Sequence, residues 1–212
     1  MRYVQRGPEP SELTEYKAFA NAEWTPRYRD FDKKAIVAIK LAREQGDLCG
    51  YCGSRIGEPK KGDCHIEHVE AQSVNPAREL DHTNMLASCQ GNDAKPPVPE
   101  HCGAARGNEP LPVTPFMPDC GMYFSFGSDG SIKAAPDPAR QKAAGDTIRI
   151  LRLNIKRLNA ARAAAIEGAL DGLDGLSANQ WRAEAARYDV PDPDGRLAPY
   201  CFAIRQVLLS YA

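Results

Sequence analysis

The sequence lacks the features that would place the chain in a membrane or outside the cell. No stretch of its 212 residues approaches the roughly 18–20 uninterrupted apolar residues of a membrane span, and the opening segment has no apolar core of the secretory type. A strong charge of either sign is also missing, because 27 Lys and Arg face 28 Asp and Glu. Bulk charge therefore predicts no nucleic-acid partner, and only local patches could supply one. We expect a soluble, cytoplasmic protein with no membrane partner.

Cysteine and histidine are scarce over most of the chain and gather in one window. Five of the seven cysteines and all four histidines lie between residues 49 and 102. An odd number of cysteines without a secretion signal argues against a disulfide framework. The window also has few apolar residues for its length, which is typical of a module held together by a metal ion. We therefore expect the chemistry of the protein in this window.

The spacing of four cysteines predicts a structural zinc site. Cys49 and Cys52 form a C-x2-C knuckle, and Cys89 and Cys102, with twelve residues between them, supply a second pair. Zinc prefers four thiolates in a tetrahedron, at about 2.3 Å from the metal. The alternative is four reduced cysteines that pack as small apolar side chains. The polar setting of the knuckle favours zinc, and the remaining three cysteines are predicted to be free thiols.

The segments on either side of the window indicate helices. A helix is predicted over residues 33–45, a hairpin over 122–134, and a helical stripe from Ile148 to Leu173. Ser177 is predicted to cap a further helix, and Pro199 to open the last one, with Tyr211 turned inward. The predicted organisation is an N-terminal arm and helix over 1–48, the Cys/His module over 49–110, and a hairpin with helices over 111–212.

A carboxylate stands beside a histidine in the middle of the window. In an extended segment, Glu67 and His68 point to opposite faces, whereas His65 and Glu67 share one face. Hydrolysis of a phosphodiester needs a base with a pKa near 7 and a cation that neutralises the phosphoryl oxygens, and histidine and a carboxylate meet these needs. A hard ion such as Mg²⁺ suits Glu67, whereas the thiolates suit zinc.

The order of these motifs resembles a known nuclease family. C-x2-C is followed by I-E-H, then by N-x-L-x-x-C and finally by H-C-G-x-x-R-G-N, an order similar to that of HNH (His-Me finger, ββα-metal) endonucleases of the four-cysteine type. The opening MRYVQRGPEP, the phrase EQGDLCGYCGSRIG and the later TIRILRLNIKRLNAAR resemble the HNH nucleases of bacterial antiphage Septu and retron systems. These are the PtuB-like subunits that work beside an ATPase.

The resemblance implies an α+β fold and a set of site residues. A small ββα-metal module with its zinc staple would lie among helices from both ends of the chain. Glu67 would bind one catalytic Mg²⁺ or Mn²⁺, His68 would activate the attacking water, and Asn84 would hold the loop around the site. The family usually has Asn or His directly after the last cysteine, where this chain has Gly103. The second protein ligand of the metal therefore stays open between two candidates, Asn108 and His101.

The activity that follows is that of a metal-dependent DNA endonuclease. The resemblance implies the nuclease effector of an antiphage system, in a hetero-oligomer with a PtuA-like ATPase. The alternative is a non-catalytic zinc ribbon that binds nucleic acid or a partner protein. His65-Ile-Glu67 also matches half of a zinc-deaminase motif, but that motif needs its C-x-x-C downstream, and here the C-x-x-C lies upstream.

Charge is distributed unevenly along the C-terminal third. Residues 133–162 carry eight basic and two acidic side chains, whereas 163–195 carry two basic and seven acidic ones. Arg149, Arg152 and Lys156 step by three and four residues, so on a continuous helix they share one face that could contact DNA phosphates. The alternative is an ordinary solvated face. The acidic stretch is expected to repel DNA and to meet the ATPase.

Overall fold

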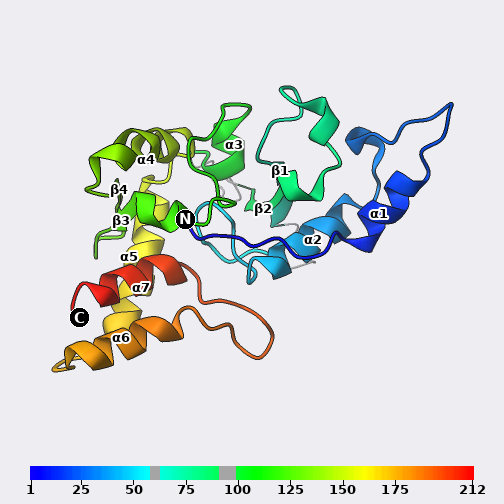
Figure 1. Cartoon of the computed structure of the whole chain (residues 1–212). Helices are drawn as coiled ribbons and strands as arrows, with labels where there is room; N and C mark the ends of the chain where they lie inside the picture. Colours follow the sequence, from blue (N-terminus) through cyan, green and yellow to red (C-terminus); the bar gives the residue numbers. More distant parts are fainter. Residues whose placement is uncertain (58–62, 91–98) are drawn as a thin grey trace.

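The computed structural model describes residues 1–57, 63–90 and 99–212, and within them the chain forms helices and two small antiparallel sheets (Figure 1). The predicted α+β class is confirmed. The helices are α1 (Ser11–Ala18), α2 (Lys34–Glu44), α3 (Cys102–Arg106), α4 (Pro138–Ile150), α5 (Lys156–Leu170), α6 (Ala178–Arg187) and α7 (Cys201–Leu209). The strands are β1 (Cys64–His68), β2 (Met85–Cys89), β3 (Phe124–Phe126) and β4 (Ile132–Ala134).

The elements follow one another along a long molecule (Figure 1). α1 lies at one end, helices α4–α7 lie with β3 and β4 at the other, and β1, β2, α2 and α3 lie between them. The N-terminal segment runs from the middle of the molecule to α1, and Val4 N donates to Pro115 O at 2.8 Å on the way. Among the helices of the described residues, none has the length and apolar content that crossing a membrane requires.

The first sheet is a pair of strands covered by a helix. β1 runs antiparallel to β2, with Glu67 opposite Leu86. All five residues of β2 are buried, and α2 packs across both strands. α2 is the helix predicted over 33–45, and its apolar residues recur at spacings of three and four. Gln45, just after α2, donates to Ala87 O at 2.9 Å and accepts from Ala87 N at 2.7 Å, which ties the helix to the centre of β2.

The predicted helical stripe from Ile148 to Leu173 is broken. α4 and α5 are separated by a turn over residues 151–155, where Arg152 has a φ of 48°. The expectation that Arg149, Arg152 and Lys156 share one helix face is therefore wrong, because Arg149 belongs to α4, Arg152 to the turn and Lys156 to α5.

Tertiary hydrogen bonds explain the break. Leu151 O accepts from Cys102 N at 2.9 Å, and Leu153 O accepts from the guanidinium of Arg162. Arg162 is 1% exposed and also donates to Gly130 O in the turn of the β3–β4 hairpin. These carbonyls accept hydrogen bonds from other segments, so no buried carbonyl is left without a partner where the helix ends.

The last two helices follow the prediction, with two exceptions. Pro199 was predicted to open the last helix, but it lies in the turn before α7, which begins at Cys201 after Tyr200. Ser177 forms a reciprocal capping box with Gln180 at the start of α6. α7 packs on α5 and α6 through a small apolar core, and its predicted inward residues are buried: Cys201, Ile204, Val207 and Leu208. Tyr211 was predicted to point inward, but the helix ends at Leu209, and the ring of Tyr211 is 52% exposed and stacks on Trp181 at 4.8 Å.

The predicted hairpin is present as β3 and β4, and its turn makes a sharp stability prediction. Gly130 has a φ of 74°, and a Cβ there would lie 2.0 Å from Asn159 O. We expect Gly130→Ala to lower the free energy of unfolding by about 2 kcal/mol or more, through left-handed strain and a backbone clash. Gly168→Ala in α5, where a Cβ meets nothing within 4 Å, should be neutral or stabilise by up to about 1 kcal/mol. Denaturant unfolding measures both, and equal effects would contradict the packing of α5 on the hairpin.

Candidate metal centre and active site

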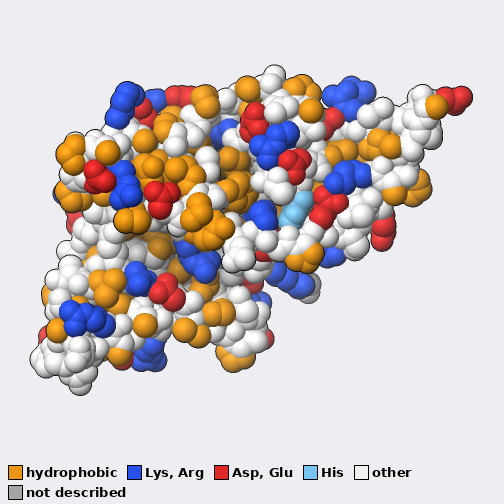
Figure 2. Space-filling view, in the orientation of Figure 1, with side chains coloured by type: hydrophobic (Ala, Val, Ile, Leu, Met, Phe, Trp, Pro, Cys, Tyr) orange, Lys and Arg blue, Asp and Glu red, His pale blue; other side chains and the backbone are white. Residues whose placement is uncertain are grey.

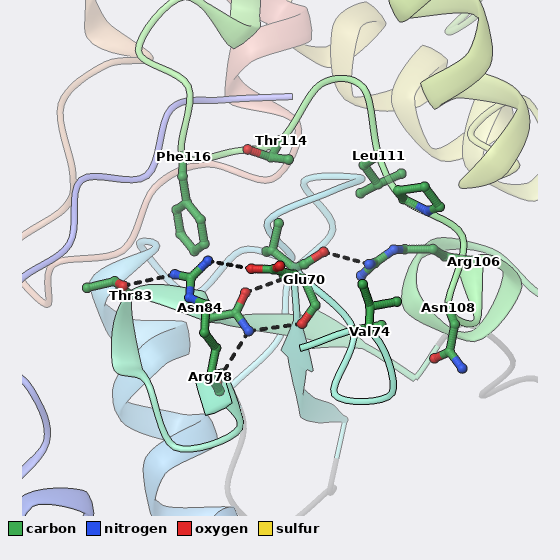
Figure 3. A pocket seen from close by; sticks show the side chains of 13 residues that line it. Glu70, Val74, Arg78, Thr83, Asn84, Arg106, Asn108, Leu111, Thr114 and Phe116 are labelled. Atoms are coloured by element: carbon green, nitrogen blue, oxygen red, sulfur yellow. Dashed lines mark hydrogen bonds and ion pairs between the residues drawn. The ribbon is translucent and has the colours of Figure 1, made fainter. Parts of the chain in front are cut away.

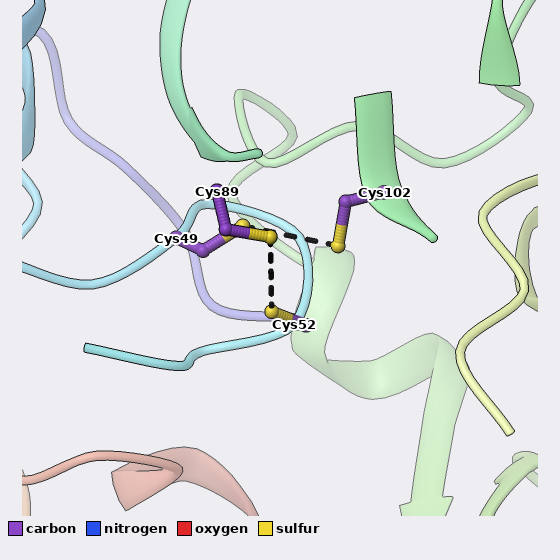
Figure 4. A group of neighbouring side chains, drawn as sticks. All are labelled: Cys49, Cys52, Cys89 and Cys102. Atoms are coloured by element: carbon purple, nitrogen blue, oxygen red, sulfur yellow. Dashed lines mark hydrogen bonds between the residues drawn. The ribbon is translucent and has the colours of Figure 1, made fainter. Parts of the chain in front are cut away.

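Four cysteines from three separate segments meet in one buried cluster (Figure 4). Their Sγ atoms all lie within 4.8 Å of one another, with 3.9 Å between Cys49 and Cys102 and 3.9 Å between Cys52 and Cys89. The edge of a tetrahedron with bonds of about 2.3 Å is about 3.8 Å, so a zinc ion fits between them. The predicted set of four is thus brought together, and its donors suit zinc.

The C-x2-C knuckle is fixed by its own backbone hydrogen bonds. In the knuckle after α2, Cys49 N donates to Ser54 O and Gly53 N donates to Cys49 O. Gly53 has a φ of 78° and lies against the ring of Phe202, where a Cβ would not fit. Cys89 ends β2 and Cys102 begins α3, and part of the excursion between them, residues 91–98, lies outside the described residues.

The protonation of the cluster also favours a cation. Hydrogen bonds from the neighbouring thiols, first from Cys102, lower the pKa of Cys52 well below the usual range, whereas burial raises the pKa of Cys102. Four buried thiolates this close together need a cation, which a metal ion held by the cluster would supply. The cysteines outside the cluster, Cys64, Cys120 and Cys201, are free thiols as predicted.

His101 belongs to this cluster. Its imidazole is 2% exposed, and its Nε2 lies 3.6 Å from Cys89 Sγ. A ring N–H that faces a ligand sulfur is a common outer contact of zinc thiolates. The structure thus places His101 beside the cysteines, although the sequence had left it as a candidate ligand next to Glu67.

Glu67 lies on the half-buried face of β1, next to α3, between three polar groups. Its Oε1 accepts from Arg106 Nη1 at 2.6 Å and lies 3.5 Å from the Tyr51 hydroxyl. Its Oε2 lies 3.5 Å from His65 Nε2. The expectation that His65 and Glu67 share one face of the strand is confirmed.

His68 points to the other side of β1 and is buried. Its Nε2 lies 2.9 Å from Glu79 O, and its Nδ1 lies 3.0 Å from Gln72 Nε2. A carbonyl can only accept, so Nε2 carries the proton and Nδ1 presents a lone pair to the amide of Gln72. The ring of Tyr28 packs edge-on against the imidazole at 4.5 Å. Burial lowers the pKa of His68, which keeps the ring neutral at pH 7.

Asn84 closes the loop between the two strands (Figure 3). Its Oδ1 accepts from Glu70 N at 2.7 Å, and its Nδ2 donates to Glu70 O at 2.9 Å and to Arg78 O at 3.4 Å. The loop that it holds carries Gln72 and Glu79, the two partners of His68. Asn84 therefore holds this loop by hydrogen bonds from both ends of its amide group.

Arg106 is a site residue that the sequence reasoning missed. Its side chain is 1% exposed, and besides Glu67 it donates to His68 O at 2.8 Å and to Val69 O at 2.6 Å. It thus joins α3 to the end of β1. The sequence held one signal: Arg106 stands three residues after Gly103, so on a helix the two residues share a face. Its burial, which makes a carboxylate partner necessary, is seen only in the structure.

Asn108 lies apart from Glu67. It is exposed beyond the C-terminal end of α3 and lines a pocket of about 450 Å³ together with Arg106, Asn84 and residues of the loop (Figure 3). Glu67 and His68 are not among the described residues that line this pocket. Gly103 faces Glu67 from the opposite end of the helix: a Cβ there would lie 2.4 Å from Glu67 Oε2.

The three basic residues proposed for DNA contact differ in their surroundings. Arg149 Nη2 donates to Glu109 Oε1 at 2.6 Å, so its charge is paired. Arg152 and Lys156 are exposed. On the face shown in Figure 2, acidic and basic side chains lie interspersed and form no continuous basic field.

Comparisons with known proteins identify a curated protein that is similar to this chain. No family model matches the chain. A curated protein from Vibrio cholerae serotype O1 biovar El Tor, described as "Retron Vc95 putative HNH endonuclease", is 27% identical over 166 residues, which cover 74% of this chain and 78% of that protein. The resemblance to a retron-associated HNH endonuclease with four cysteines is therefore confirmed.

The cluster predicts that stability depends on zinc. Cys102→Ser should remove most of the bound zinc and lower the melting temperature by about 10 °C or more, because metal binding supplies folding free energy to this region. Cys64→Ser, on β1 but outside the cluster, is the matched control and should keep its zinc. Elemental analysis and calorimetry test both variants. Folded wild-type protein without zinc would contradict the assignment.

Proposed function

We propose that the chain is a metal-dependent DNA endonuclease of the HNH type, the cytoplasmic nuclease effector of a bacterial antiphage system. The observation that carries the proposal is the end of β1. There, Glu67 and a neutral His68 project from consecutive positions, and Asn84 holds the loop that orients His68. The retron association of the curated relative supports the same function.

The elements around these residues support a ββα-metal module. β1 and β2 form the hairpin, and α3 follows the last cysteine of the cluster and lies with Gly103 directly over Glu67. Arg106 joins α3 to both residues of the pair, through the Glu67 carboxylate and the His68 carbonyl. Because its nitrogens are engaged by protein oxygens, Arg106 positions Glu67 and does not contact phosphate.

In the proposed mechanism His68 is the general base. Its Nε2 proton is committed to the Glu79 carbonyl, so the Nδ1 lone pair accepts the proton of the attacking water. The amide of Gln72 occupies that position in the structure, and it must give way to the water. In this mechanism Gln72 binds the lone pair of His68 Nδ1 until the attacking water replaces it.

Glu67 is the residue that would hold the catalytic Mg²⁺ or Mn²⁺. Arg106 engages Oε1, and Oε2 is directed toward the space below Gly103, which a Cβ would fill. This cradle fits a small cation with an oxygen ligand. When bound, the ion would neutralise charge that develops on the phosphoryl oxygens.

Substitution of the pair tests the nuclease against a non-catalytic zinc ribbon. His68→Ala should lower cleavage of plasmid DNA by about a hundredfold or more, because a positioned base contributes that much to the rate. Glu67→Gln should also lose activity and recover part of it at high Mn²⁺. Both variants should keep the zinc content of the wild type. Glu67→Gln leaves the buried charge of Arg106 without its carboxylate, so a lower melting temperature is expected for that variant. Wild-type protein that never cleaves, with Mg²⁺ or Mn²⁺ and with its ATPase, would favour the zinc ribbon.

The charges of α5 support two further surfaces. Lys156 and Arg157 begin the helix, and the exposed Asp171 and Asp174 follow its end, about 20 Å away for its 15 residues. A helix prefers the opposite arrangement, with acidic residues at its N-terminus and basic ones at its C-terminus. These charges therefore do not serve the stability of α5. We assign the basic end, with Arg152, to DNA and the acidic end to an ATPase subunit.

Two charge reversals, each the control of the other, test these surfaces. Arg152→Glu with Lys156→Glu should weaken DNA binding and reduce its salt dependence, because two phosphate contacts are lost. Asp171→Lys with Asp174→Lys should weaken co-purification with a co-expressed PtuA-like ATPase. Glu184 is left unchanged, because it pairs with Arg187 at 2.9 Å. The assignment of the surfaces is wrong if the basic variant loses ATPase binding or the acidic variant loses DNA binding. It is also wrong if a variant changes neither property.

A further inference from the structure

We propose that His65 is the second protein ligand of the catalytic metal ion. This inference rests on the proposed nuclease function and names a residue that takes the place of the side chain missing at Gly103. Both protein ligands, His65 and Glu67, would then come from β1.

The distance between the two side chains suits one shared ion. His65 Nε2 and Glu67 Oε2 are 3.5 Å apart, and they lie on the same face of β1. This separation is longer than an ordinary N–H···O hydrogen bond of about 2.7–3.2 Å. An ion about 2.1 Å from each atom bridges such a gap.

The hydrogen bonding of His65 is also incomplete. Its Nδ1 is buried and has no hydrogen-bond partner within the described part of the chain. The nitrogen that would bind the ion is the other one, Nε2, which makes no ordinary hydrogen bond to the Glu67 carboxylate and would be satisfied by an ion between the two groups. Arg106 holds the other carboxylate oxygen at 2.6 Å, so Glu67 Oε2 stays directed toward His65.

Gly103 provides the space for the ion. A Cβ on residue 103 would lie 2.4 Å from Glu67 Oε2 and 3.1 Å from His65 Nε2. A side chain on this turn of α3 would therefore enter the gap between the two groups. Without one, α3 leaves the gap open, and the strand supplies the ligand instead.

The other candidates are placed elsewhere. His101 faces Cys89 in the zinc cluster, and Asn108 lies beyond the far end of α3. In His68, Nδ1 faces the side chain of Gln72 and Nε2 faces the carbonyl of Glu79, so neither ring nitrogen faces Glu67. Among the histidines, His65 alone has a nitrogen directed at the Glu67 carboxylate.

An imidazole ligand changes which ions the site prefers. Nitrogen donors favour transition-metal ions over Mg²⁺, and affinity for divalent ions rises from Mn²⁺ through later members of the series. A site formed by Glu67 and His65 should therefore bind Mn²⁺ more tightly than Mg²⁺, and the difference between the two affinities should shrink when His65 is replaced.

Pulsed electron paramagnetic resonance of Mn²⁺ on the zinc-loaded full-length chain tests this directly. The wild type should show nitrogen-14 modulation from a coordinated imidazole. His65→Ala should remove the modulation and weaken Mn²⁺ binding about tenfold or more, since even outer contacts of a metal site are worth that much. His82→Gln, which removes another imidazole outside both metal sites, is the matched control and should keep both properties.

A second variant covers the case in which His65→Ala alters the fold. Gly103→Ala places a methyl group in the gap and should weaken Mn²⁺ binding while zinc content stays constant. Nitrogen modulation that persists in His65→Ala, or Mn²⁺ affinity that is unchanged in both variants, overturns the assignment. If Mn²⁺ shows the His65 nitrogen but the protein cleaves no DNA, the nuclease proposal fails and the ligand assignment stands. If the protein cleaves DNA but Mn²⁺ shows no nitrogen modulation, the ligand assignment fails and the nuclease proposal stands.

Discussion

The structure depends above all on the meeting of four sulfur atoms. The cluster joins the knuckle after α2, the end of β2 and the start of α3, three segments that are far apart in sequence, and it lies within the main apolar core. Cys102 then donates its N–H to Leu151 O, so the cluster also fixes the turn between α4 and α5. The position of α3 over β1, and with it the surroundings of Glu67, follows from this one set of contacts.

The two proposed metal sites are adjacent but chemically distinct. Cys102 belongs to the cysteine cluster and Gly103, the next residue, borders the carboxylate of Glu67. Soft thiolates select zinc, whereas a carboxylate with one imidazole suits a harder, exchangeable ion. A single short helix therefore connects the site that maintains the fold to the site that would perform hydrolysis, and Arg106 completes the connection from the other end of the helix.

The sequence predicted those features that depend on local spacing. The cysteine set follows from its C-x2-C knuckle, and the shared face of His65 and Glu67 follows from the two-residue period of a strand. The sequence could not show what depends on distant partners. The turn at 151–155 exists because Cys102 and Arg162 bond its carbonyls, and His101 turns to Cys89 across an excursion whose course no pattern specifies. Arg106 was missed because its partners come from β1, nearly forty residues earlier.

The charges at the two ends of α5 oppose the helix dipole, and this has a consequence for the evolution of the chain. Removing a charge of unfavourable sign from a helix end raises stability by about 0.3–1 kcal/mol. Natural proteins tolerate costs of this size, because selection removes only the changes that bring stability below the level that function requires. Neutral substitutions at Lys156 or Asp171 are therefore routes to a more stable chain, and a loss of activity in such variants would show that the charges at the ends of α5 serve function.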